Sequence, residues 1–204
     1  MIDFVFPKNN EQEFIKLAVR LGFKSLCFIY EKPTKIDEFQ STSNLKIYSG
    51  LLCTSKSVSK NKNKADFILM QAEEDSQNRF ILENGSANIL FDLELSKRGD
   101  FIHHRASGLN QVTSKLALEK DTVIGFSFNS ILNLSGRKRA VLFGRISQNI
   151  RFARKFKFKT VFASFASEPM QMRSPTSLQA VLKTLGMTPG EAKSSLIVND
   201  LLDK

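Results

Sequence analysis

Short runs of apolar residues, each too short to form a helix, recur along the whole chain. Runs of about four to eight apolar residues, bounded by Gly, Pro or polar residues, are typical of buried strands. The pattern therefore predicts about seven strands, at residues 2–6, 25–30, 46–53, 67–71, 88–93, 122–128 and 160–165.

Apolar residues at helical spacing lie between several of these runs. Asn10 is a candidate cap, and the helix that follows it is expected to end at Gly22. The apolar face of this helix comprises Phe14, Leu17, Ala18 and Leu21. Two further helices are predicted at 107–120 and 139–156. Their apolar faces comprise Leu109, Val112 and Leu116 in the first, and Leu142, Ile146, Ile150 and Ala153 in the second.

The segment Thr188-Pro189-Gly190-Glu191 has the form of a capping box with Pro at the first helical position. It predicts a final helix whose apolar face comprises Ala192, Leu196, Ile197 and Leu201.

Strands that alternate with helices indicate βα units and a mainly parallel sheet with the helices outside. A complete eight-fold barrel usually needs about 250 residues. The 204 residues here therefore predict a single α/β domain, 1–204, with a TIM-barrel-like fold that is compact or incomplete. An open doubly wound sheet is the structural alternative. The polar, basic segment 55–64 is expected to be an exposed loop, and its lysines make it a candidate contact for a polyanion.

The composition favours a soluble, cytoplasmic protein. Hydrophobic residues make up 42% of the chain, and no stretch approaches the roughly 20 consecutive apolar residues that cross a bilayer. No membrane partner is therefore expected. Cys27 and Cys53 lie inside apolar runs without metal-ligand spacing, which is typical of reduced, buried thiols.

The chain is strongly basic, with 30 Lys and Arg against 20 Asp and Glu, a formal charge of +10 and a pI near 9.7. Polyanions such as RNA or DNA are the partners that such a charge favours. The acidic residues are denser before position 100, and the clusters of Lys and Arg from position 97 onward indicate a basic face. These are Lys97, Arg98, Arg105, Arg137, Lys138, Arg139, Arg145, the segment 151–159 and Arg173.

The segment 98–110 lies where a predicted strand runs into a predicted helix, the place where βα folds put functional groups. A helix N-terminus next to Arg105 and a histidine can hold a phosphate. The competing interpretation is that Ser107 only caps the helix and the histidines hydrogen-bond locally. His103 and His104 are adjacent, so in a strand they point to opposite faces and cannot chelate one ion. No bound metal or other cofactor is expected.

The eighteen Phe residues are expected to be mostly core, among them Phe126, Phe128, Phe162 and Phe165. The sequence has no RNP-like aromatic motif, GxxG clamp or P-loop, so recognition of RNA shape and backbone is expected.

Three segments of the chain resemble one family. They are 98–120 (RGDFIHHRASGLNQVTSKLALEK), 137–167 (RKRAVLFGRISQNIRFARKFKFKTVFASFAS) and 168–202 (EPMQMRSPTSLQAVLKTLGMTPGEAKSSLIVNDLL). Together they are similar to the thirty-kilodalton-type protein subunit of archaeal and eukaryotic ribonuclease P, also called protein component three in archaea. The first half of the chain matches this family only by pattern.

The resemblance implies a TIM-barrel-like fold of the polymerase and histidinol phosphatase superfamily. Active enzymes of that superfamily open with a D-x-H-x-H metal motif, but the stretch 3–6 (DFVF) lacks the histidines. In the family, the RNA subunit removes the 5′ leader of precursor tRNA with magnesium ions. The implied partners of the chain are ribonuclease P RNA, precursor tRNA in the holoenzyme and another small protein subunit. The chain itself would be a non-catalytic subunit.

Charge and resemblance together give the candidate RNA-binding residues. They are Arg98, His103, His104, Arg105, Ser107, Asn110, Arg137, Lys138, Arg139, Arg145, Asn149 and Arg173, with Gly108 and Gln148 added by the resemblance alone. Arg105 and Arg145 are expected to be at least partly exposed, so that replacing either changes stability by no more than about 0.5 kcal/mol. The alternatives are a stand-alone metal-dependent phosphoesterase of the same superfamily and a general RNA-binding scaffold.

Overall fold

The computed structural model describes residues 1–36, 39 and 45–197, and in it seven parallel strands form one sheet in sequence order. The strands are β1 (Ile2–Val5), β2 (Ser25–Tyr30), β3 (Lys46–Cys53), β4 (Phe67–Gln71), β5 (Ile89–Phe91), β6 (Val123–Ser127) and β7 (Thr160–Ala163). All neighbouring pairs are parallel, so their carboxyl ends meet at one end of the sheet. The predicted bounds of β2, β3 and β4 are confirmed, and the other strands are shorter than predicted.

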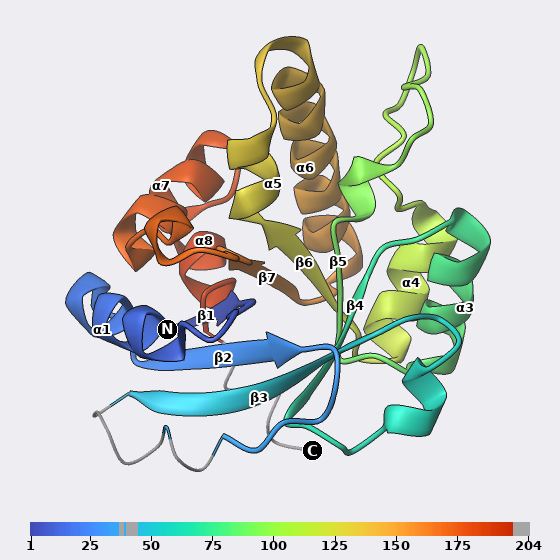
Figure 1. Ribbon diagram of the computed structural model, residues 1–204. Coiled ribbons are helices and arrows are strands. Elements are labelled where there is room, and N and C mark those ends of the chain that lie inside the picture. Colours follow the sequence, from blue (N-terminus) through green and yellow to red (C-terminus); the bar gives the residue numbers. More distant parts are fainter. Residues whose placement is uncertain (37–38, 40–44, 198–204) are drawn as a thin grey trace.

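The sheet curls until its first and last strands lie side by side. Just beyond both strands, the Phe6 amide donates to the Ala166 carbonyl at 2.8 Å. At the other end of the seam, the Ile2 amide donates to the Leu196 carbonyl at 3.0 Å, so the segment after the last helix fills the place of a missing strand. The result is a nearly closed barrel (Figure 1). The TIM-barrel-like prediction is confirmed, and the open sheet is wrong.

Helices pack around the outside of the barrel (Figure 1). They are α1 (Glu11–Leu21), α3 (Asp75–Asn84), α4 (Gln111–Glu119), α5 (Phe128–Asn133), α6 (Gly136–Phe156), α7 (Pro175–Thr184) and α8 (Pro189–Ser194). Gly22 ends α1 in the left-handed conformation, as predicted, but the Asn10 side chain does not cap this helix. The capping box of Thr188 and Glu191 is confirmed. Leu201, predicted on the last apolar face, lies outside the described residues.

The predicted start of the helix at 107 is wrong. The helix α4 begins at Gln111, and its N-cap is Asn110, whose Oδ1 accepts from the Val112 and Thr113 amides at 2.8 and 3.0 Å. The buried face of α4 also differs from the predicted one, since Val112 is 52% exposed whereas Thr113, Ser114 and Ala117 are buried. Ser107 therefore has a role other than capping.

Aromatic rings fill the inside of the barrel. The Phe91 and Phe165 rings stack at 4.4 Å between centroids, and Phe4 and Phe6 contact Phe165 from β1 and the residue after it. The Phe67 ring meets Phe4 edge-on at 5.4 Å. Each ring buries a large apolar area, and such ring–ring contacts stabilise the core beyond that burial. The prediction that Phe126, Phe128, Phe162 and Phe165 belong to the core is confirmed, and so is the burial of Cys27 and Cys53.

The segment 55–64 contains a short 3₁₀ helix, Val58–Asn61, and Val58 is buried, which fixes this segment to the barrel. Its lysines are exposed: Lys56, Lys60, Lys62 and Lys64.

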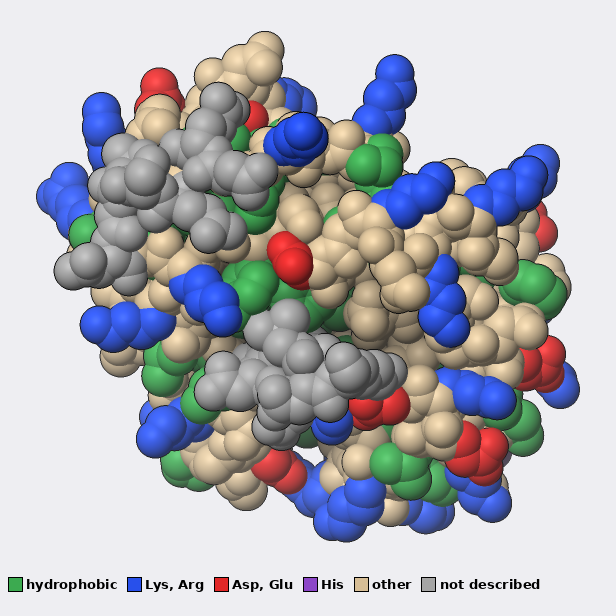
Figure 2. All heavy atoms as spheres, turned by 90° about the horizontal axis from the view of Figure 1, so that it is seen from below, with side chains coloured by type: hydrophobic (Ala, Val, Ile, Leu, Met, Phe, Trp, Pro, Cys, Tyr) green, Lys and Arg blue, Asp and Glu red, His purple; other side chains and the backbone are tan. Residues whose placement is uncertain are grey.

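Figure 2 shows one face of the molecule with Lys and Arg side chains spread around it among fewer acidic ones. Positive charge is therefore distributed on this face and not gathered in one compact patch.

Candidate nucleic-acid interface

The connection between β5 and α4 contains the most informative segment of the sequence. After a 3₁₀ turn at Leu93–Leu95, the chain leaves the carboxyl end of the barrel and returns at Asn110. Figure 1 shows that its middle part extends away from the helices. We call residues 96–105 the projecting loop.

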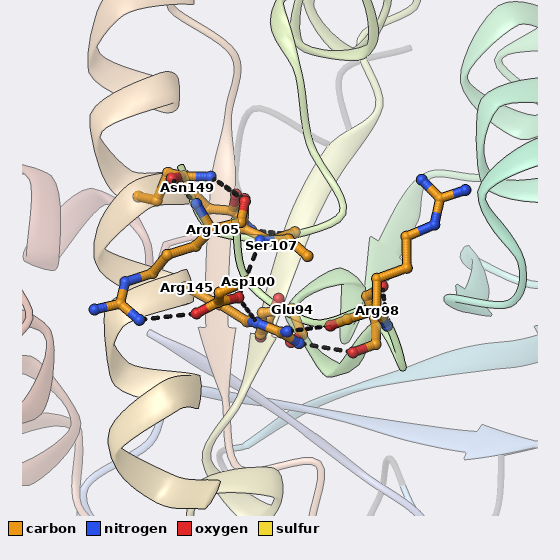
Figure 3. A network of polar contacts seen from close by, with 10 residues as sticks. Glu94, Arg98, Asp100, Arg105, Ser107, Arg145 and Asn149 are labelled. Atoms are coloured by element: carbon orange, nitrogen blue, oxygen red, sulfur yellow. Dashed lines mark hydrogen bonds and ion pairs between the residues drawn. The ribbon is translucent and has the colours of Figure 1, made fainter. Parts of the chain in front are cut away.

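A buried arginine on α6 fixes the projecting loop to the barrel (Figure 3). Arg145 is only 6% exposed, and its Nε donates to Asp100 Oδ1 at 2.8 Å. Its Nη1 donates to the carbonyls of Glu94 and Ser96 at 3.0 and 2.7 Å, and its Nη2 donates to the Arg98 carbonyl at 2.5 Å. The five donors of a guanidinium fit such a set of acceptors. One side chain thus shapes the base of the loop.

The next turn of α6 holds the returning part of the loop. Asn149 is fully buried, and its Nδ2 donates to the Ser107 carbonyl at 2.9 Å. The Gln148 amide accepts from the Arg105 amide at 2.9 Å and donates to the Arg105 carbonyl at 2.8 Å. Gln148 Nε2 also donates to the Ser107 hydroxyl at 2.7 Å. The side chains of Gln148 and Asn149 therefore substitute for the backbone partners that this irregular segment lacks.

Two glycines make room for these contacts. Gly108 has φ +78°, and a Cβ placed on it would lie 2.4 Å from the Leu93 carbonyl oxygen. Gly144 lies in the middle of α6, where a Cβ would come within 2.4 Å of the Arg105 guanidinium. Glycine is unfavourable inside helices, and at 144 its missing side chain leaves room for the Arg105 guanidinium to lie against α6.

We expect Gly108→Ala to lower the free energy of unfolding by about 2 kcal/mol, because a side chain at this backbone conformation is strained and would also clash with a backbone oxygen. Gly99→Ala is the matched control, since a Cβ at Gly99 has no described atom within 4 Å. The control should change stability by less than about 0.5 kcal/mol. Urea unfolding of both variants measures the difference, and equal midpoints would contradict the role of Gly108.

Charges at this junction respond to burial and to the arginines. Partial burial acts to raise the pKa of Asp100. Hydrogen bonds from Arg145, the Ala106 amide and Arg105 outweigh this effect and hold that pKa below its usual value. Arg105 Nη1 pairs with Asp100 Oδ2 at 2.9 Å. Burial raises the pKa of Glu94 well above its usual range, and its two carboxyl oxygens have no hydrogen-bond partner among the described residues. Asp100 is thus the charged partner of the network.

Burial changes the assignment of three predicted RNA contacts. The expectation that Arg145 is partly exposed is wrong, because its guanidinium lies inside the junction. Ser107 and Asn149 are also buried. These three side chains hold the loop in place, and their polar contacts are made within the protein. The Asn110 side chain, although exposed, is engaged as the cap of α4.

Other predicted residues reach the surface. Those that are exposed are Arg98, His103, His104, Arg105, Arg137 and Lys138, while Arg139 and Arg173 are half-buried. Arg98 pairs with Asp75 at 2.6 Å. Arg139 Nε donates to the Leu134 carbonyl at 2.6 Å, and Arg173 donates to the Met170 and Met172 carbonyls. The exposed residues come from the projecting loop and from the start of α6.

The first turn of α6 has an unusual distribution of charge. It begins Gly136-Arg137-Lys138-Arg139, with no acidic residue in the first turn and no cap from the Ser135 side chain. Cations are unfavourable at this end of a helix, where the unpaired amides and the macrodipole favour an anion. A bound phosphate would remove that conflict. The arrangement therefore fits an anionic partner.

Nothing in the described part of the chain forms a metal site, since no three His, Cys, Asp or Glu side chains gather there. His103 and His104 lie in the projecting loop and not in a strand. Asp3 belongs to the barrel seam, where its Oδ1 accepts from the Ser164 amide at 2.6 Å. Phe4 and Phe6 contact Phe165 in the aromatic core.

Two residues of this region, Gly144 in α6 and Phe101 in the projecting loop, were not predicted from the sequence to have a role of their own. The signal for the first was a glycine inside a strongly helical pattern. The signal for the second was an aromatic residue between a Gly-Asp pair and two histidines, in a segment too polar to be core.

Among the described residues, no helix has both the length and the apolar character needed to cross a bilayer.

Comparison with known proteins agrees with this geometry. The family model of RNase P subunit p30 matches residues 2–200. Ribonuclease P protein component 3 of Methanosarcina acetivorans is 29% identical, with 92% of this chain and 80% of that protein aligned. The same component of Methanocaldococcus jannaschii is also 29% identical, over 86% of this chain and 79% of that protein.

A solved structure gives the same result. A chain in the cryo-EM structure of archaeal ribonuclease P with mature tRNA superposes with a TM-score of 0.81 at 25% sequence identity, covering 96% of this chain and 86% of that one. The family match extends over the first half of the chain, which resembled the family only by pattern, as well as over the projecting loop and α6. This chain therefore belongs to the RNase P subunit p30 family.

Proposed function

We propose that this chain is an RNA-binding protein subunit of ribonuclease P, which supports removal of the 5′ leader of precursor tRNA by the catalytic RNA. The observation that carries the proposal is the junction between α6 and the projecting loop. A buried network uses Arg145 to fix the loop, while Arg105, Arg137 and Lys138 stay exposed at the same end of the barrel. Family membership supports ribonuclease P RNA as the partner that these cations would contact.

The proposed mechanism is indirect. Exposed cations neutralise phosphates, which lowers the magnesium concentration that the catalytic RNA needs to fold and holds that RNA in a productive geometry. Magnesium acts with the RNA, and the chain supplies no catalytic group. Another small protein subunit completes the proposed assembly. The aromatic interior of the barrel and the lack of histidines in the stretch 3–7 support a non-catalytic role.

Reconstitution tests this function. Ribonuclease P RNA is assayed for cleavage of precursor tRNA at low magnesium, with and without this chain and together with the other protein subunits. We expect the chain to raise the cleavage rate at low magnesium and to have less effect at high magnesium. The chain alone, assayed with manganese on a phosphodiester, should be inactive. Turnover by the chain alone, which persists through purification, would favour the phosphoesterase alternative instead.

The double variant Arg137→Gln/Lys138→Gln should weaken RNA binding about tenfold and reduce the log–log salt slope by about 1.5 to 2, because each lost phosphate contact removes roughly one counterion from the exchange. Lys183→Gln/Lys193→Gln removes the same charge from exposed positions near the ends of α7 and α8. That control should bind nearly as well as the wild type. Equal losses in both variants would show that net charge, and not the start of α6, governs binding.

A further inference from the structure

The tip of the projecting loop exposes apolar side chains that the proposed mechanism does not use. Ile102 is 96% exposed and Phe101 is 55% exposed. Single exposed apolar residues are common, but these two are consecutive and lie next to two exposed histidines. Water contact at so much apolar surface is unfavourable. The tip therefore fits a partner that covers it.

Two rings at the tip already form a stacked pair. The Phe101 and His104 rings lie 4.5 Å apart between centroids, with an interplanar angle of 19°. The Phe101 amide donates to the His104 carbonyl at 2.9 Å, which closes the turn that brings the rings together. One face of each ring packs on the other ring. The remaining face of Phe101 is available to a third flat group.

The base of the loop keeps this pair in a defined position. Arg145 donates hydrogen bonds to the carbonyls of Ser96 and Arg98, on the side of the loop that leaves the barrel. Asp100, directly before Phe101, accepts from Arg145 and from the Ala106 amide at 3.0 Å on the returning side. Ordering a flexible loop opposes binding, and a loop ordered in advance avoids that cost. The rings are thus preorganised.

The charges around the tip indicate what the flat group is. Lys97, Arg98 and Arg105 lie on both sides of the tip and are exposed. Asp100, the acidic residue of the loop, is engaged by two arginines. An anionic partner with a flat aromatic face matches this surface better than an apolar groove of a protein does. A nucleotide whose base is unpaired has both properties.

We propose that the tip of the projecting loop is a base-stacking site, in which Phe101, supported by His104, stacks on an unpaired nucleotide of the bound RNA while Arg98 and Arg105 contact the adjacent phosphates. The inference rests on the proposed RNA-binding function. It adds a contact to single-stranded RNA, whereas the start of α6 contacts only phosphates. Recognition of shape and backbone is then supplemented by recognition of an unstacked base.

The test compares two RNA probes with the full chain. One is a stem–loop RNA with the fluorescent adenine analogue 2-aminopurine in its loop, and the other is a fully paired duplex of equal length. Phe101→Leu removes the ring but keeps an apolar side chain, and Phe101→Tyr restores a ring. Phe80→Leu, at a residue of α3 that is 48% exposed, is the matched control. Affinity and fluorescence are measured for each protein.

Phe101→Leu should weaken binding to the stem–loop about five- to a hundredfold, the usual loss when one stacked base is removed. Binding to the duplex should stay unchanged. The fluorescence quenching by stacking should disappear in Phe101→Leu and return in Phe101→Tyr, while Phe80→Leu should behave as the wild type.

Equal affinity of Phe101→Leu and wild type for the stem–loop would overturn the inference. So would an equal loss on both probes, since the duplex offers no unpaired base. Loss of a protein subunit from the reconstituted assembly, with RNA binding intact, would assign the tip to a protein partner and overturn it as well. If wild type binds neither probe at low salt, the proposed function itself fails, and that outcome differs from each of the others.

Discussion

Replacing Arg145 by leucine is expected to lower the free energy of unfolding by about 3–5 kcal/mol, because three backbone carbonyls inside the junction lose their hydrogen-bond donor and Asp100 loses one of its two arginine partners. The guanidinium is 6% exposed and bonds Asp100 and three backbone carbonyls. Leucine cannot donate to any of them. The expectation of a change within about 0.5 kcal/mol depended on exposure of Arg145, which the structure contradicts.

Urea unfolding of Arg145→Leu beside Arg151→Leu measures this effect. Arg151 lies on the same helix and is exposed, so its replacement should change stability by no more than about 0.5 kcal/mol. Arg145→Lys should recover only part of the loss, because an ammonium group cannot match the fork of bonds that a guanidinium makes. Coincident unfolding curves for the two leucine variants would show that the network does not stabilise the fold.

The strands were predictable because each is a short, buried apolar run. The strands β2, β3 and β4 have the predicted bounds, since polar or Pro-containing segments follow each run directly. The helix α3 was missed for a physical reason. Its buried face includes Asn78 while Phe80 is exposed, so its apolar periodicity is weak. The helix α5 has only 6 residues, too few for a period to repeat.

The helix α7 could have been predicted. Pro175, Leu178 and Leu182 are its buried residues, at spacings of three and four, and a Pro directly after Ser174 is a known start signal. The barrel seam could not have been read from the pattern. It depends on Asp3 and Ser164, which are 161 positions apart in the chain, and such a distant pair has no local signature.

At the site, the sequence identified the segments that form the junction, but it did not predict that several of their polar side chains are buried. Arg145 and Asn149 lie on the same helical face as Leu142, Ile146 and Ile150, three and four residues apart. That spacing predicts burial for both polar side chains. Their polar character and the basic composition of the helix led instead to the prediction of RNA contacts. The position within the apolar period was the more reliable indicator.

Relative to wild type, the variant Asp3→Asn is expected to become more stable as the pH rises. The difference in unfolding free energy should change by about 3 kcal/mol between acidic and neutral pH. Burial raises the pKa of Asp3 to about 6, against hydrogen bonds from Ser164 and the Phe4 amide that act to lower it. An acid whose folded-state pKa is raised stabilises the fold only while it is protonated. That contribution is complete below the unfolded pKa of 3.8 and is lost as the pH rises to about 6. The difference between a pKa of 3.8 and one of about 6 corresponds to about 3 kcal/mol of stability.

Asparagine keeps an oxygen for the two amides and has no proton to lose in this range. Unfolding free energies of wild type and Asp3→Asn at about pH 4, 5, 6 and 7 should therefore give a difference that grows in favour of the variant and levels off near pH 6–7. Taking the difference cancels the contribution of Glu94, whose pKa is also raised by burial. A difference that stays constant with pH would show that Asp3 does not titrate at the seam. One that favours the wild type more as the pH rises would show that the carboxylate, and not the acid, stabilises the closure of the barrel.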